Sequence, residues 1–120
     1  MEIDFEIYVS DSKNVRIPVY DVAGNPVDLT AASIEWHIAE WMGAPPLLSK
    51  HRVPGGADTE IGIEPGVSSL VPNQMIVKIL EDEIDWVGGI YVHHAVVSYT
   101  GARDTVKVGM VSVMDAPIAA

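Results

Sequence analysis

The stretch Trp86–Thr100, which reads WVGGIYVHHAVVSYT, decides the fold class. Most of its residues are β-branched or aromatic, the types that fit a pleated and half-buried surface. Gly88 and Gly89 begin the run and Gly101 follows it, as turn residues do at strand ends. Because neither face is purely polar, the strand is predicted either to be central and covered on both sides or to meet another chain. Its two faces are Ile90, Val92, His94, Val96, Ser98 and Tyr91, His93, Ala95, Val97, Tyr99.

Length and composition predict one domain, which we place at residues 1–114, followed by a tail at 115–120 of the 120-residue chain. The chain has no cysteines, so disulfides and thiolate metal sites are excluded. Seventeen acidic and 7 basic residues give a net charge of −10, which argues against nucleic acids and anionic membranes as partners. The mean hydropathy of +0.23 is high for so acidic a chain. It predicts either a large core or an apolar surface that meets a partner.

Runs with a period of two recur along the rest of the chain. With the turn residues between them, they predict seven to nine short strands, the pattern of an antiparallel β-sandwich or barrel. Residues 31–42 are ambiguous, because their apolar positions fit a strand or a capped helix equally well. The strand is preferred here, since the neighbouring segments also alternate. In that strand Ile34, Trp36 and Ile38 would share one face.

Three local features refine this interpretation. Pro18 cannot donate to a strand ladder, so its strand is expected at an edge or beside a bulge. The acidic segment Glu81–Trp86 is expected to form one helical turn. Near the end of the chain, the alternation of Val111 and Val113 is out of phase with the residues before them, and Gly109 sits at the change. A β-bulge at Gly109 would explain both facts.

Three motifs occur in a recognisable order: D-x-x-G-N-P-V-D-L-T at Asp21–Thr30, G-x-Y at Gly89–Tyr91 and G-x-V-x-V at Gly109–Val113. In these the chain resembles the immunoglobulin-like N-terminal domain of phage baseplate upper proteins, and small proteins encoded among the tail and baseplate genes of bacteriophages and prophages. The resemblance implies an immunoglobulin-like β-sandwich with a structural role in a virion assembled in the bacterial cytoplasm, and no catalysis or cofactor. It also implies that the Tyr91 ring packs near the turn at residues 81–89.

The histidines and the acidic run are the residues that most suggest chemistry. His93 and His94 are neighbours on a strand and should point to opposite faces, so they cannot easily bind one metal ion. With His37 and His51 they are interpreted as unrelated strand residues. The carboxylates of the acidic run could be a catalytic pair or calcium ligands, but a charged run beside a turn is usually only solvated. These carboxylates are Asp82, Glu83 and Asp85.

Glycines and tryptophans give two further candidates. The pairs Gly55-Gly56 and Gly88-Gly89 lack the neighbouring residues of phosphate-binding loops and are interpreted as turns. The tryptophans could stack on sugars if they were exposed in one row, but at least one is expected in the core, and we assign Trp36 there. With Tyr91 and Gly109, Trp36 completes the predicted structural residues. The three tryptophans are Trp36, Trp41 and Trp86.

The sequence therefore favours a non-enzymatic structural or assembly protein that acts through protein–protein surfaces and binds copies of itself, other tail proteins or both. A carbohydrate-binding or adhesion module of the same fold is the alternative. A small β-barrel enzyme or ligand carrier is a third hypothesis and would need an interior cavity. The candidate interface is one face of the long strand, namely Ile90, Val92, His94 and Val96.

Overall fold

The fold is seen in a computed structural model of the chain, which describes residues 3–66, 70–99 and 102–115. In these ranges the protein consists of strands, turns and loops, and no helix is long and apolar enough to cross a bilayer. The expected tail lies outside the described residues except for Asp115. The strands are β1 (Ile3–Tyr8), β2 (Lys13–Pro18), β3 (Ser33–Ala39), β4 (Leu48–Arg52), β5 (Ile61–Glu64), β6 (Gln74–Ile79), β7 (Gly89–Tyr99) and β8 (Ala102–Met114).

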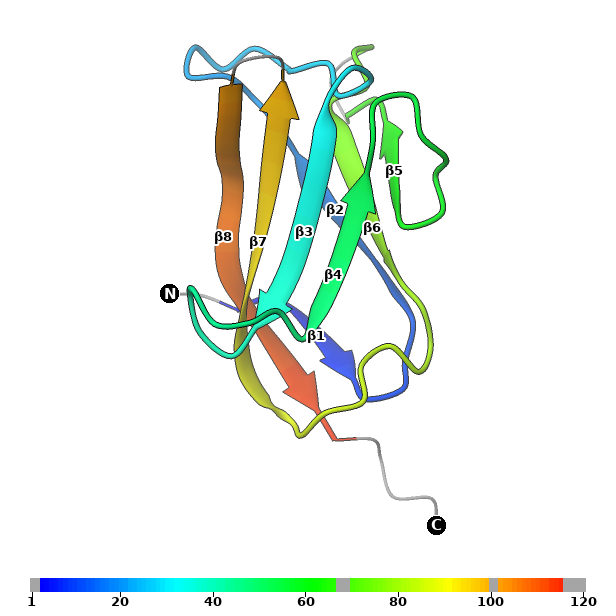
Figure 1. Cartoon of the computed structure of the whole chain (residues 1–120), viewed down its shortest axis with the longest axis vertical. Helices are drawn as coiled ribbons and strands as arrows, with labels where there is room; N and C mark the ends of the chain where they lie inside the picture. Colours follow the sequence, from blue (N-terminus) through cyan, green and yellow to red (C-terminus); the bar gives the residue numbers. More distant parts are fainter. Residues whose placement is uncertain (1–2, 67–69, 100–101, 116–120) are drawn as a thin grey trace.

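Two sheets pack face to face, as predicted for a β-sandwich (Figure 1). One sheet has five strands in the order β1-β8-β7-β3-β4, and the other has three in the order β2-β6-β5. All pairings are antiparallel except that of β1 with β8, which is parallel. The long strand β7 lies at the centre of the larger sheet, between β8 and β3. On each face of the sheet, the side chains of β7 therefore lie between those of β8 and β3.

The strand order is that of an immunoglobulin-like sandwich. Strands β2, β6 and β5 correspond to strands B, E and D of that fold, and β3, β7 and β8 correspond to C, F and G, with β4 beyond C as in variable-type domains. Immunoglobulin domains carry a buried tryptophan on strand C, and Trp36 on β3 is fully buried. His93 stands two residues after Tyr91, where antibody domains have a disulfide cysteine.

The core lies between the sheets and follows from the period-two alternation. The ambiguous segment 31–42 contains the strand β3 and no helix, so Ile34, Trp36 and Ile38 share the inner face of β3 and are 0% exposed. The pairing of β2 with β6 alone makes β2 an edge strand, which confirms the expectation from Pro18. The inner residues of the two sheets form one apolar cluster with the loop residues Leu29 and Ile84.

Two local predictions were wrong. The segment 81–86 contains a turn and no helix, because Asp82 adopts a φ of 71° and the Glu83 carboxylate turns back to accept the Leu80 N–H at 2.6 Å. The bulge in β8 is at Val106 and not at Gly109. The register pairs Ala95 with Lys107 and then Val96 with Thr105, so Val106 is the extra residue, whereas Gly109 pairs regularly with His93.

Gly109 is required for a different reason. A Cβ atom at this position would lie 1.6 Å from Asp4 Oδ2 and 3.1 Å from His93 Nε2. The missing side chain therefore makes room for the Asp4 carboxylate, which bonds to His93 Nε2 at 2.9 Å and to Lys107 Nζ at 3.2 Å. Glycine is used here for a close approach between strands and not for its backbone freedom.

We predict that Gly109→Ala destabilises the fold mainly through Asp4. The new methyl group would displace the carboxylate and leave the buried His93 N–H without an acceptor, which costs roughly 1–3 kcal/mol. Denaturant unfolding of Gly109→Ala, Asp4→Ala and the double variant would measure the coupling. The double variant should lose less free energy of unfolding than the two single variants lose together. Additive costs would show that Gly109 is needed for something other than the Asp4 carboxylate.

Candidate functional site

The four residues of the predicted interface lie on the outer face of the five-stranded sheet. They alternate on β7 with residues that point into the core, as the sequence predicts. Ile90 is 53% exposed, and Val92 and His94 are half-buried. Val96 is only 3% exposed, although it does not belong to the core cluster between the sheets. A partner at this face would therefore contact Ile90, Val92 and His94, with Val96 mostly covered.

The strand register extends this face with apolar residues from β8 and β1. Val92 is paired with Met110, His94 is paired with Val108, and Met110 is paired in turn with Ile3. Ile3 and Val108 are 40% and 39% exposed, and Met110 is half-buried. These three residues were not predicted, because they reach the face only through the pairing of β8 with β7 and of β1 with β8. We call the set the outer apolar band: Ile3, Ile90, Val92, Val108 and Met110.

A pair of histidines borders the band on the β3 side. The rings of His37 and His94 lie 5.0 Å apart, and His37 Nδ1 is 2.8 Å from Ser49 Oγ. Burial lowers the pKa of His94, and electrostatic interactions with His37, His93 and Arg103 lower it further, against the opposing effect of Glu35. His94 is thus held in its neutral form near pH 7.

His93 points the other way, into the sandwich, and takes part in a buried chain of hydrogen bonds. The Trp36 indole N–H donates to His93 Nδ1 at 3.2 Å, so the imidazole proton is on Nε2, which donates to Asp4 Oδ2. Burial lowers the pKa of His93, although the Asp4 carboxylate opposes this. For Asp4, the bonds from His93 and Lys107 outweigh burial, and the pKa is lowered. This chain links β1, β7 and β3 and is structural in character.

The remaining candidates occupy structural positions. Glu83 forms an ion pair with the buried Lys50 at 2.6 Å, whereas Asp82 and Asp85 are exposed. His51 is exposed on β4, where it pairs with Glu35 of β3. Within the described residues, no group of three or more histidine or carboxylate side chains is placed to hold a metal ion. Gly55 lies in a turn with a φ of 69°, and Gly89 begins β7.

The three tryptophans lie in different environments. Trp36 is in the core, as predicted, and Trp86 is half-buried against the Tyr91 ring, with 5.9 Å between their centroids. Trp41 is 59% exposed in the β3–β4 loop. The tryptophans therefore do not form the exposed row that a sugar-binding platform would need. Tyr91 lies as the resemblance implied, and its hydroxyl donates to the Val87 carbonyl in the preceding turn.

No protein-family model matches this chain, and no curated protein matches it. The resemblance to phage baseplate proteins therefore rests on the three sequence motifs and stays a prediction. The outer apolar band is the surface of this protein best suited to contact a partner.

Proposed function

We propose that this chain is a non-enzymatic structural protein that assembles through the outer face of its five-stranded sheet. The observation that carries the proposal is the outer apolar band, which crosses β1, β8 and β7 on a protein with a net charge of −10. The band contains no charged side chain, so a contact centred there would desolvate little charge. Apolar surface of this kind on an otherwise acidic protein is typical of a contact site.

The partner that these features favour is a second copy of the chain, with neighbouring tail proteins as further partners. A face that carries the same apolar strip on each copy can pair with itself about a two-fold axis. A stable contact would bury at least about 1,000 Å² in total. His94 at the border of the band is neutral near pH 7, so it would not place two positive charges against each other in such a contact.

A bacteriophage or prophage particle is the proposed setting, with assembly in the bacterial cytoplasm. This part of the proposal is supported by the motifs at Asp21–Thr30, Gly89–Tyr91 and Gly109–Val113. The genes beside the one that encodes this chain provide a direct test. Neighbouring genes for tail or baseplate proteins would support the setting, whereas an operon of metabolic enzymes would contradict it.

Self-association is tested by Ile90→Glu. We expect this variant to be folded, because the Ile90 side chain is half exposed, and to associate at least about tenfold more weakly than the wild type, since a charge is placed within the apolar contact. Val53→Glu is the matched control, because Val53 is also 53% exposed but lies beyond β4, away from the band. Light scattering over a range of protein concentrations would measure both variants.

Salt gives a second readout of the same contact. The net charge of −10 opposes the approach of copies, so association of the wild type should strengthen as moderate salt screens this repulsion. Equal loss of association in Ile90→Glu and Val53→Glu would indicate a general charge effect and not a contact at the band. A strict monomer at high concentration in every salt would exclude self-assembly and leave another tail protein as the partner.

A further inference from the structure

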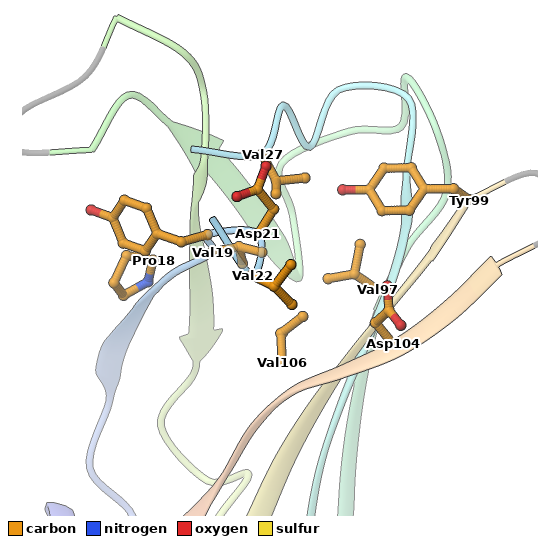
Figure 2. A pocket seen from close by; sticks show the side chains of 10 residues that line it. Pro18, Val19, Asp21, Val22, Val27, Val97, Tyr99, Asp104 and Val106 are labelled. Atoms are coloured by element: carbon orange, nitrogen blue, oxygen red, sulfur yellow. The ribbon is translucent and has the colours of Figure 1, made fainter. Parts of the chain in front are cut away.

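A pocket of about 470 Å³ opens at the end of the sandwich where β7 and β8 are joined. Figure 2 shows Val22 and Val27 from the β2–β3 connection facing Val97, Tyr99 and Val106 from β7 and β8. The volume of the pocket is within the range of small-molecule sites. The sequence did not reveal it, because its walls come from segments that are far apart along the chain: 18–22, 27, 97–99 and 104–106.

The inner wall of the pocket is apolar. Val19 and Val97 are 4% and 0% exposed, and Val27 and Val106 are half-buried beside them. Two of these valines come from the β2–β3 connection and two from β7 and β8, and together they form a surface that can hold a short alkyl or aromatic group. A bare metal ion would gain nothing from such a surface, and no three-ligand cluster is present in the described residues. The pocket is therefore suited to an organic ligand.

One polar group in the pocket lacks a partner. The Tyr99 hydroxyl oxygen is buried and has no hydrogen-bond partner in the structure. Figure 2 shows this hydroxyl at the end of a ring that extends across the pocket toward Asp21 and Val27. Buried hydroxyl groups in proteins nearly always form a hydrogen bond. A ligand in the pocket would supply the missing partner, since a phenol can donate or accept.

The charge around this hydroxyl is negative. Asp21 and Asp104 line the pocket from opposite sides, and none of its lining residues is basic. Burial raises the pKa of Tyr99, and the carboxylates of Asp28 and Asp104 raise it further. Asp21 uses Oδ1 to accept the N–H groups of Ala23 and Asn25, each at 2.9 Å, while Asp104 has no ion pair with any described residue.

We propose that this pocket binds an alkylammonium group, with its alkyl chain against the valines and its ammonium between Asp104, Asp21 and the Tyr99 hydroxyl. An ammonium has three N–H donors, which matches two carboxylates and one phenol oxygen. Such a group is found in free aliphatic amines and in the lysine side chain of a partner protein. The site is at the end of the sheets and does not depend on assembly through the outer apolar band.

Hexylammonium and its neutral isostere hexan-1-ol are the probes that test the site. Titration of the ¹⁵N-labelled protein should give saturable shifts of the Val97, Tyr99 and Val106 amide signals with hexylammonium, at an affinity of about 1 mM for so small a ligand. Hexan-1-ol has no positive charge and should bind at least about fivefold more weakly. Equal binding of the two probes would overturn the proposal, and so would the absence of saturable shifts with hexylammonium.

Isosteric variants test which side chains contribute to the binding of hexylammonium. Asp104→Asn should weaken hexylammonium binding about fivefold, and Tyr99→Phe about threefold, while both remain folded because neither group has a partner to lose. Glu81→Gln is the control, since it removes one exposed carboxylate in the β6–β7 turn at the other end of the sandwich. Unchanged affinity in Asp104→Asn, or an equal loss in Glu81→Gln, would show that only the net charge attracts the amine.

The two sources of the ammonium group are separated by Nα-acetyl-lysine N-methylamide, which carries the same head on a peptide backbone. Binding as tight as that of hexylammonium, with the same loss in Asp104→Asn, would support the site and indicate a lysine of a partner protein. Binding of hexylammonium alone would also support the site and indicate a free amine, because the pocket then excludes the peptide backbone. Failure of both probes would overturn the site without bearing on assembly.

Discussion

Tyr91→Ala is expected to leave the protein at or near the limit of stability. Removal of a packed aromatic side chain costs roughly 3–5 kcal/mol, and the total stability of a small domain is about 5–15 kcal/mol. The Tyr91 ring packs against the core cluster and Trp86, and its hydroxyl holds the Val87 carbonyl. Its pKa is raised by burial, with a further contribution from the carboxylates of Glu40 and Asp115, so the hydroxyl stays protonated as a donor.

Two further variants separate the ring from its hydroxyl. Tyr91→Phe keeps the ring and loses only the bond to Val87, so it should cost about 1 kcal/mol. Tyr8→Ala removes a tyrosine that is 39% exposed on β1 and should cost much less than Tyr91→Ala. Denaturant unfolding would compare all three variants with the wild type. A midpoint for Tyr91→Ala close to that of the wild type would show that the ring is not part of the packed end of the sandwich.

The alternation of apolar residues made the sandwich predictable, because side chains of a strand point alternately to the two faces. It also placed Ile90, Val92 and His94 on one outer face and Trp36 in the core. The same rule could not predict that β1 joins β8 in parallel, since alternation carries no information on the direction of a neighbouring strand. The apolar surface contributed by Ile3 was therefore not foreseen.

The error at Gly109 has a physical cause, which is contact between residues far apart in the sequence, and contacts of the same kind explain two buried cations. Gly109 was interpreted as a bulge because glycine and a change of phase occur together there, but its small size serves Asp4, a residue on β1. Lys50 and Arg52 alternate on β4 and are both buried, because Glu83 and Asp58 neutralise them from other loops. Charged residues on alternate positions of a strand can thus lie in the interior when residues from other segments form ion pairs with them.

Trp36→Ala should have the largest effect of any single change considered. The Trp36 side chain is 0% exposed at the centre of β3, so truncation creates a large cavity and costs roughly 3–5 kcal/mol. It also removes the donor to His93 Nδ1, and a buried acceptor without a partner adds about 1–3 kcal/mol. The sum is comparable to the whole stability of a small domain. We expect little folded protein at 25 °C, as judged by the loss of dispersed amide signals.

Trp36→Phe tests the same position in a variant that folds. It keeps an aromatic ring beside His93 but has no N–H, so the free energy of unfolding should fall by about 2 kcal/mol, from a smaller ring and an unpaired imidazole nitrogen. Trp41→Phe is the control. Because Trp41 is exposed, this substitution should change the free energy of unfolding by no more than about 0.5 kcal/mol. The ¹⁵N chemical shifts of the His93 ring provide a direct readout, since the shift of Nδ1 should change when it no longer accepts a hydrogen bond from the indole N–H. Equal stability of the two variants, with an unchanged Nδ1 shift, would show that the indole does not donate to His93 and that Trp36 contributes to the core by its volume alone.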